Sequence, residues 1–209
     1  PGSETLDMGG WQVVVADGHA VLPEGMTHLP DRVFINRTSL VSVAFQSSLV
    51  SIGSFAFADC SSLVSIDLPA SLTSIGEGAF CNCSSLANVT FPVGLTSIGG
   101  YAFSFCSALV SIDLPATLTS IGDGAFGSCS ALSSITFSAT LTSIGNRAFE
   151  CCSSLVYIDL PATLTTIGMQ AFYYCSALTS VTLPAGLTSI GDYAFECCSS
   201  LAAISLPVG

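Results

Sequence analysis

The sequence predicts a solenoid of stacked 23-residue repeats whose core consists of ladders of equivalent side chains. A cysteine, a phenylalanine and an Ile-Gly pair each recur with this period. The recurring cysteines are Cys60, Cys83, Cys106, Cys129, Cys152, Cys175 and Cys198. A repeat of this length cannot bury its own apolar face, whereas stacked copies form one continuous core.

One repeat reads L-x-x-I-x-L-P-x-x-L-T-S-I-G-x-x-A-F-x-x-C-x-x. Its first part alternates apolar and polar side chains, as in residues 109–114, where Leu109, Ile112 and Leu114 are apolar. This alternation is typical of a short strand with one buried face. Pro115 follows and ends the strand, because proline has no N–H to donate to a ladder.

The second part of the repeat predicts another brief strand and a turn. The strand is "LTSI" at 118–121, and Gly122 suits the change of direction after it. The stretch "GAFGSC" that follows predicts one helical turn that buries Ala125, Phe126 and Cys129.

The repeats divide the chain into four parts. Residues 1–20, which contain the only Trp, lie outside the period and are expected to form an N-terminal cap. Residues 21–39 are a degenerate first repeat, and residues 40–200 hold seven full repeats. Residues 201–209 begin an incomplete eighth repeat, so we expect the chain to continue. The open strand edge at 201–206 should then be covered by more repeats or by a partner.

The repeat motif resembles the BspA-like class of leucine-rich repeats, over about residues 21–209. The resemblance implies a leucine-rich-repeat solenoid, a curved right-handed coil. A parallel β-sheet would form its concave face, with short strands and turns on the convex face. Members of this class are commonly secreted or displayed on the surface of bacteria and protists. They are associated with adhesion and protein binding, which the resemblance implies for this chain as well.

The charge balance excludes several kinds of partner. Only Arg32, Arg37 and Arg147 oppose 14 acidic residues, which gives a net charge of −11. Nucleic acids and anionic membrane surfaces require clustered cations, so neither is an expected partner. No apolar run approaches the roughly 20 residues that span a bilayer, so direct membrane insertion is not expected either.

Acidic residues alternate along the first strand of the repeats. Asp67, Asp113 and Asp159 occupy the same strand position in every second repeat, with Thr between them, which indicates duplication of a 46-residue unit. They should line the concave face about 10 Å apart. One interpretation is that this face is solvated and that the intervening Thr residues relieve repulsion between the carboxylates. The alternative is that the carboxylates form an acidic stripe that recognises a basic partner. Tyr157, beside Asp159, interrupts a small polar track and is the best candidate contact for an extended protein or a carbohydrate.

Aromatic residues occupy the turn positions of several repeats. They are Phe55, Tyr101, Phe105, Tyr173, Tyr174 and Tyr193. Because they flank the inward Ala-Phe pair, they should point partly outward, on the convex side. Clustered exposed aromatics mark a contact surface. The alternative interpretation is that they pack against neighbouring rungs of the stack.

Cysteines and sequons point to different compartments. The seven ladder cysteines should be buried free thiols, because stacked side chains point in parallel, and Cys81, Cys151 and Cys197 are extra. Free thiols favour a reducing compartment. Asn36, Asn82 and Asn88 each begin an N-x-[ST] sequon, which favours an extracellular one, although a glycan on Asn88 would block the concave strand. The resemblance favours an extracellular or cell-surface location, with the cytoplasm as the alternative.

No catalytic motif is present in the sequence. The only histidines are His19 and His28, and no metal-ligand spacing or phosphate-binding loop occurs, so no cofactor or metal is expected. The preferred hypothesis is a protein- or glycan-binding scaffold without catalytic activity, with a role in surface adhesion or recognition. The alternative is a structural subunit of a larger assembly, docked through the convex aromatics or the C-terminal edge strand.

Overall fold

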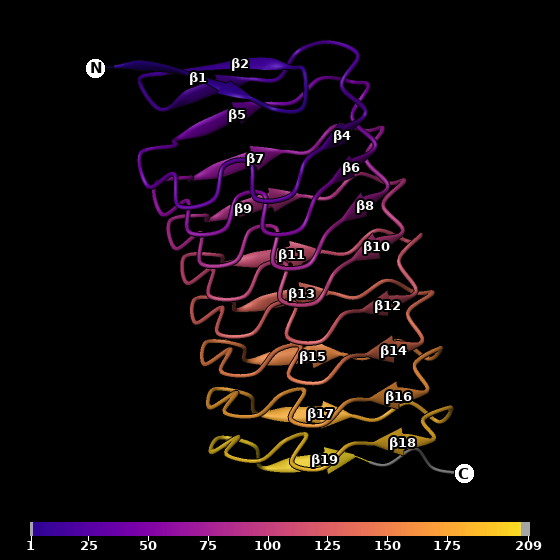
Figure 1. The fold of residues 1–209 in the computed structure, drawn as a ribbon. Helices are drawn as coiled ribbons and strands as arrows, with labels where there is room; N and C mark the ends of the chain where they lie inside the picture. Colours follow the sequence, from indigo (N-terminus) through magenta and orange to yellow (C-terminus); the bar gives the residue numbers. More distant parts are fainter. Residues whose placement is uncertain (1, 206–209) are drawn as a thin grey trace.

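The computed structural model describes residues 2–205 and shows a solenoid of short β-strands, as predicted (Figure 1). Each turn of the coil contributes a three-residue strand on one side and a two-residue strand on the other. No helix occurs in this range, and therefore no helix long and apolar enough to cross a membrane.

The strands form one N-terminal group and two ladders. The N-terminal group is β1 (Ser3–Asp7), β2 (Gln12–Ala16) and β3 (His19–Val21). The three-residue strands are β5 (Ser42–Ala44), β7 (Ser65–Asp67), β9 (Asn88–Thr90), β11 (Ser111–Asp113), β13 (Ser134–Thr136), β15 (Tyr157–Asp159), β17 (Ser180–Thr182) and β19 (Ala203–Ser205). The two-residue strands are β4 (His28–Leu29), β6 (Ser51–Ile52), β8 (Ser74–Ile75), β10 (Ser97–Ile98), β12 (Ser120–Ile121), β14 (Ser143–Ile144), β16 (Thr166–Ile167) and β18 (Ser189–Ile190).

Both ladders are parallel, and a strand that pairs does so in register with the strand one repeat away, as Ser111 does with Ser134. The three-residue ladder is divided into hydrogen-bonded groups, β7–β9, β11–β13 and β15–β17–β19. Each of these groups begins with a strand that ends in Asp. The hydrogen bonding therefore follows the 46-residue alternation of the sequence.

The prediction of a helical turn after each Ile-Gly pair is wrong. Two residues per repeat in this segment adopt left-handed backbone conformations, such as Tyr101 (φ 56°) and Phe105 (φ 60°). The N–H groups of Tyr101, Phe103 and Phe105 donate to carbonyls of the next rung at 2.7, 2.8 and 2.8 Å. A helix would direct these donors to carbonyls four residues earlier in the same segment. The left-handed residues instead point alternate amides along the solenoid axis.

The core consists of ladders of stacked side chains. Phenylalanine rings from Phe34 to Phe195 stack with centroids 5.0 to 5.6 Å apart. Each ladder cysteine donates its thiol proton to the carbonyl of the phenylalanine 26 residues earlier, as in Cys129 to Phe103 at 3.2 Å. The thiols are therefore hydrogen-bonding groups as well as small apolar side chains.

An antiparallel hairpin covers the N-terminal end of the core. Strand β1 pairs with β2, β2 pairs with β3, and β3 then pairs in parallel with β5. Met8, Val13 and Val15 of this segment are buried in the same apolar cluster as the first repeats. The hairpin thus shields apolar side chains that the first rung would otherwise expose to water.

Candidate binding surfaces

The outer side of the three-residue strands, here called the strand face, carries the acidic residues identified in the sequence. In β11, Ile112 is buried whereas Ser111 and Asp113 are exposed. Asp67 and Asp159 take the same exposed position in β7 and β15. Within residues 2–205 the ion pairs are Arg37–Glu4 and Arg147–Glu150. None of the three strand-face carboxylates is therefore neutralised by a cation of the described chain.

Tyr157 is the large side chain on this face. It begins β15, is 59% exposed, and pairs in register with Ser180 of β17. Ser134 holds the equivalent position on β13. Because its neighbours on both sides are serines, the ring rises above a flat polar surface. Asp159 lies two residues further along the strand, so the ring and the carboxylate face the same side.

Two of the aromatic turn residues pack on the next rung. The rings of Phe55 and Tyr101 lie over Gly78 and Gly124, where an added Cβ would come within 2.3 and 2.4 Å of them. The guanidinium carbon of Arg32 lies 5.7 Å from the centre of the Phe55 ring, which permits a cation–π contact. These two aromatics contribute to the stacking of the repeats, while Tyr101 still presents a partly exposed edge.

The other four aromatic turn residues are distributed unevenly. Phe105 is exposed near the middle of the solenoid. Tyr173, Tyr174 and Tyr193 lie close to its C-terminal end, and Tyr173 and Tyr174 meet edge to face at 4.8 Å. Tyr174 and Tyr193 are exposed and Tyr173 is half-buried. Tyr173 and Tyr174 therefore form a local aromatic surface.

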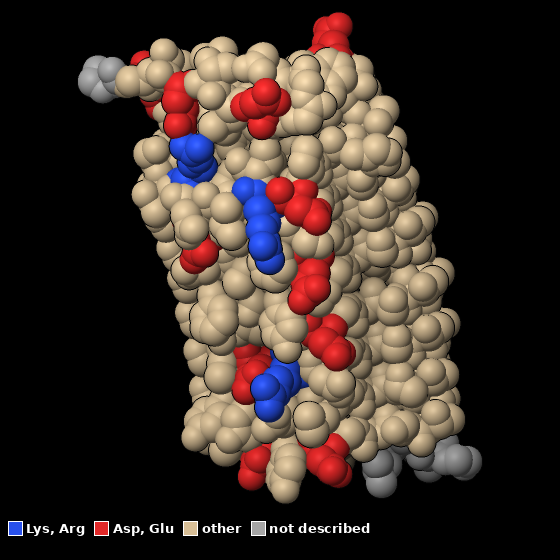
Figure 2. Space-filling view, in the orientation of Figure 1, with Lys and Arg blue, Asp and Glu red and all other residues tan. Residues whose placement is uncertain are grey.

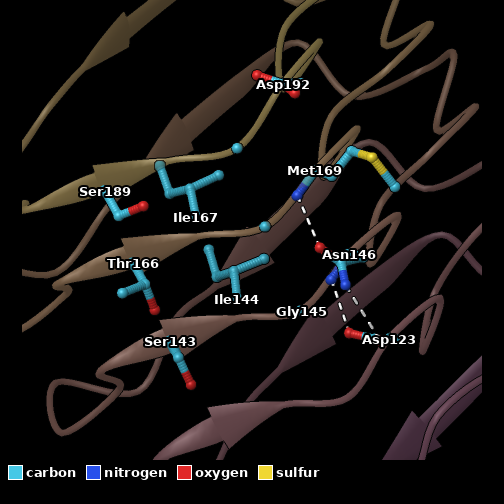
Figure 3. Close-up of a pocket in the computed structure, with 12 residues that line it drawn as sticks. Asp123, Ser143, Ile144, Gly145, Asn146, Thr166, Ile167, Met169, Ser189 and Asp192 are labelled. Atoms are coloured by element: carbon cyan, nitrogen blue, oxygen red, sulfur yellow. Dashed lines mark hydrogen bonds between the residues drawn. The ribbon is translucent and has the colours of Figure 1, made fainter.

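A shallow groove of about 530 Å³ runs beside β14, β16 and β18, and sequence reasoning missed it (Figure 3). Its floor is bare backbone at Gly145, Gly168 and Gly191, where a Cβ would approach the previous rung to 2.3–2.6 Å. Glycine is required there because successive rungs approach so closely. The recurring Ile-Gly pair was the available signal, but the groove itself depends on how the rungs stack.

A chain of polar side chains follows the edge of this groove. Asp123 accepts hydrogen bonds from the backbone N–H of Asn146 at 2.8 Å and from its side-chain amide at 3.3 Å. Asn146 in turn accepts one from the N–H of Met169 at 2.8 Å, whereas Asp192 lies apart from this chain (Figure 3). Asp123 and Asn146 thus cap free backbone amides of the turns. Among the residues that the structure describes, no group of three or more metal-ligating side chains converges.

Arg37 and Arg147 form ion pairs with acidic residues, and Arg32 lies over the Phe55 ring. On the face shown in Figure 2, each patch of Lys or Arg atoms lies against Asp or Glu atoms. Arg147 also donates to the side-chain oxygen of Gln170 at 2.8 Å. The right-hand flank, over the two-residue strands of Figure 1, carries neither charge. On the face shown, the charged side chains are therefore confined to the part outside this uncharged flank.

The three sequons differ in their surroundings. Asn36 is exposed in a turn, and Asn88 is exposed at the start of β9 on the strand face. The side-chain nitrogen of Asn82 donates to the carboxylate of Asp59 at 2.7 Å. That nitrogen is the atom a glycan would modify, so Asn82 is the poorest acceptor in the folded chain.

All ten cysteines are free thiols in the structure. Burial raises the pKa of Cys60 and Cys129 to about 12. Burial also raises the pKa of the half-buried Cys81 and Cys151, and Cys197 is exposed. The ladder thiols are therefore protonated and shielded, which makes them unreactive at neutral pH.

Each histidine contacts a serine on the next rung. Nδ1 of His19 lies 2.7 Å from Oγ of Ser42, and Nδ1 of His28 lies 2.6 Å from Oγ of Ser51. Both pairs lie on exposed strand positions. In the described part of the chain no carboxylate hydrogen-bonds to either ring, so neither pair is completed to a Ser-His-acid triad.

Comparison with known proteins identifies the family. The profile described as "BspA type Leucine rich repeat region" matches in six copies, over residues 18–130 and 96–209. The chain belongs to the BspA-type leucine-rich repeat family. A search of curated proteins found no match.

Solved structures agree with this assignment. A leucine-rich repeat protein of T. pallidum is 32% identical with a TM-score of 0.70, covering 88% of this chain and 78% of that one. A leucine-rich repeat protein of Bacteroides ovatus is 21% identical with a TM-score of 0.61, covering 99% and 75%. A leucine-rich cell surface protein of Faecalibacterium prausnitzii is 21% identical with a TM-score of 0.57, covering 100% and 96%. These three proteins are described as leucine-rich, and the chain shares their fold.

Proposed function

We propose that this BspA-type chain is a rigid binding module that recognises a basic segment of a protein through its strand face. The observation that carries the proposal is the pairing of Tyr157 with uncompensated carboxylates. An exposed aromatic ring supplies contact area at low conformational cost, and carboxylates without a cationic partner attract and orient a basic chain. Asp113 ends β11 and Asp159 ends β15. Strand β13 lies between them, so the two carboxylates are two rungs apart.

The geometry of the strand face favours an extended partner. Its exposed positions recur with every rung at about 4.8 Å, and small side chains surround the single large ring. A peptide lying along the solenoid axis would meet a carboxylate about every 10 Å, which is the span of roughly three extended residues. A basic residue at every third position is therefore the pattern that fits best.

The test uses a defined probe, a fluorescent peptide with Arg at every third position and Ser or Gly elsewhere. Binding is measured by fluorescence anisotropy at several salt concentrations. We expect binding that weakens as salt rises, because exposed charges are screened. Tyr157→Ala and Asp113→Asn should each weaken binding about tenfold, with no change in thermal stability.

Two variants serve as matched controls. Tyr193 is 60% exposed, close to the value for Tyr157, but lies on a turn rather than on the strand face. Tyr193→Ala and Asp192→Asn should leave peptide binding unchanged. Equal losses in the test and control variants would refute recognition by the strand face. Selective binding of neutral glycans from an array, lost with Tyr157→Ala, would assign the same face to carbohydrate instead.

A surface location with an adhesive role is part of the same proposal. One relative is described as a cell surface protein, and a chain of this family that recognises other proteins would act most simply outside the cell. Surface labelling of intact source cells with a membrane-impermeant amine reagent is unsuitable because the chain has no Lys. Immunolabelling of unpermeabilised cells is the appropriate measurement, and staining only after permeabilisation would contradict the proposed location.

A further inference from the structure

A shallow cavity of about 510 Å³, here called the β13–β15 cavity, lies at the edge of the strand face between the rungs of β13 and β15. Complete rungs flank it on both sides (Figure 1). The residues that line it are Phe137, Ala139, Asp159, Leu160, Pro161 and Ala162. Five of these six side chains are apolar, and the sixth supplies a carboxylate.

The cavity coincides with a break in the three-residue ladder. Strand β11 pairs with β13, and β15 pairs with β17, whereas in the described chain no pairing joins β13 to β15. After β11, the N–H of Leu114 donates to the carbonyl of Thr136 at 3.0 Å. After β13, no such bond joins the N–H of Phe137 to the carbonyl of Asp159 in the described chain. Backbone hydrogen bonds therefore do not close the space between the two rungs at this point.

The preceding rung explains why the cavity lies beside Asp159. The sequence D-L-P-A-T-L occurs without change at 113–118 and at 159–164, so these residues alone cannot create it. Phe91, which precedes the first copy by one rung, is buried and meets two rings of the phenylalanine ladder edge to face. Phe137, which precedes the second copy, is half-buried and meets one ring within the described residues. Part of the Phe137 side chain is therefore left open to the cavity.

The charge of the cavity selects the kind of ligand. The carboxylate of Asp159 is its single charged group, and Asp159 takes part in neither ion pair of residues 2–205. A carboxylate beside apolar side chains attracts a cation more strongly than one surrounded by water, because it is screened less. The matching ligand has a cationic head on an apolar stem, which describes the side chain of arginine.

We propose that the β13–β15 cavity anchors the basic segment of the partner by taking up one arginine side chain. The aliphatic stem lies against Phe137, Leu160 and Pro161, and the guanidinium group pairs with Asp159. A guanidinium group can form two parallel hydrogen bonds with a carboxylate, which fixes its orientation. The inference rests on the proposed function, because it names the point at which the strand face holds its partner.

The test compares three peptides. The first is the peptide with Arg at every third position, the second keeps one Arg and carries citrulline at the others, and the third carries citrulline throughout. Citrulline is close to arginine in shape but has no charge. Each peptide is titrated into protein with ¹³C-labelled alanine methyl groups, and the methyl signals are followed by NMR. We expect both arginine peptides to shift the signals of Ala139 and Ala162, and the third peptide to leave them unchanged.

Two pairs of variants locate the contact. Asp159→Asn and Ala162→Phe should each weaken binding of the single-arginine peptide at least about tenfold, by removing the charge or filling the cavity. Asp113→Asn and Ala116→Phe are the matched controls, since they lie in the same local sequence, and both should leave its affinity unchanged. Ala116 and Ala162 are exposed, so a larger side chain adds no volume to the core. Thermal unfolding checks that all four variants stay folded.

The possible outcomes separate the anchor from the wider proposal. Equal losses in the two pairs of variants, or equal binding of the citrulline peptide, would overturn the anchor. Binding of the repeated-arginine peptide without shifts at Ala139 and Ala162 would overturn the anchor and leave recognition by the strand face intact. Shifts at these two alanines that Tyr157→Ala does not affect would support the anchor and count against the wider face. If no peptide binds, both proposals are wrong.

Discussion

Left-handed residues are the most distinctive residue-scale feature of this chain. Tyr101 and Phe105 adopt this conformation although they are bulky, at a cost of roughly 1–2 kcal/mol each. The cost is offset by the interrung hydrogen bonds that their amides form. Gly124 adopts the same conformation without penalty and leaves room for the Tyr101 ring above it. From Phe55 to Gly124, large residues and glycines thus alternate along this column, whereas large residues follow at the next three equivalent positions.

A pair of glycine substitutions tests this account. Gly124→Ala should destabilise the protein by about 2 kcal/mol or more, because the backbone is left-handed (φ 61°) and the new Cβ would lie 2.4 Å from the Tyr101 ring. Gly94→Ala should stabilise it by about 0.4–1 kcal/mol, since the nearest atom is 3.7 Å away and φ is not positive. Urea unfolding of both variants provides the comparison. A similar change in both would show that the ring–glycine contact has no energetic role.

The buried thiols predict the response of stability to alkaline pH. Burial raises the pKa of Cys60 and Cys129 to about 12, above the value near 8.5 of an unfolded thiol. The unfolded state therefore loses protons first as the pH rises. Each such thiol stabilises the fold fully below about pH 8.5. That contribution is then lost at about 1.4 kcal/mol per pH unit up to the folded pKa.

The measurement is the urea midpoint at pH 8, 9, 10 and 11. Stability should fall steeply over this range. Cys129→Ala should reduce the slope of stability against pH by the contribution of one thiol. It should also lower stability at neutral pH, because it removes part of a buried side chain. A stability that stays constant up to pH 11 would contradict the burial of the ladder.

At the scale of elements, the solenoid is held by ladders rather than by any single strand. Strands of two or three residues are too short to be stable alone, and each depends on the rungs on both sides. Phe126 shows this dependence, because it stacks on Phe103 at 5.5 Å and on Phe149 at 5.6 Å. A terminal rung has such support on one side only.

Alanine substitution along the phenylalanine ladder measures this support. Phe126→Ala should cost about 3–5 kcal/mol, the usual value for a fully enclosed ring. Phe195→Ala should cost only about 1–2 kcal/mol, because the side chain is partly buried and stacks on one neighbour. Chemical denaturation with circular dichroism detection distinguishes the two. Equal costs would indicate that something covers the last rung in solution.

The sequence predicted the elements with uneven success. The strand expected at 109–114 is the shorter β11, and the one expected at 118–121 is reduced to β12. Their positions follow from alternation, but their ends depend on which backbone groups the next rung pairs. The prediction of a helical turn was wrong because the amides of the left-handed residues hydrogen-bond to carbonyls 22 residues away. Local sequence patterns carry no information about such contacts.

At the scale of the whole molecule, negative charge, thiols and sequons bear on where the protein works. Asn36 is exposed, whereas the side-chain nitrogen of Asn82 is held by Asp59. The seven ladder thiols are enclosed, so only Cys81, Cys151 and Cys197 are accessible to reagents in the folded chain. These differences allow one measurement to report both location and fold.

The measurement is the intact mass of protein from its native source, alkylated without reduction. If the chain passes through a pathway that adds N-linked glycans, we expect Asn36 to be occupied and Asn82 to be unmodified. Under native conditions at most three cysteines should be alkylated, and all ten after denaturation. An unglycosylated protein would favour the cytoplasm, and rapid native alkylation of more than three thiols would contradict the buried ladder.

The candidate sites could be predicted only in part. The exposed positions of Asp113 and Tyr157 follow from period-two alternation, because a strand with buried Ile112 must point its neighbours outward. Whether each aromatic turn residue packs on the next rung or stays exposed could not be predicted in this way. Phe55 and Tyr101 cover glycines, whereas Tyr193 is free, and the difference depends on which residue occupies the next rung.

The sequence alone therefore determined the 23-residue period, the identity of the buried ladders and the family. The reason is that each of these depends on residue type at a fixed spacing along one chain. The tertiary structure decided the conformation of the turns, the thiol–carbonyl bonds and the groove beside the Ile-Gly pairs. Each of these depends on contacts between residues 22 to 26 positions apart, and such contacts exist only when the rungs are stacked.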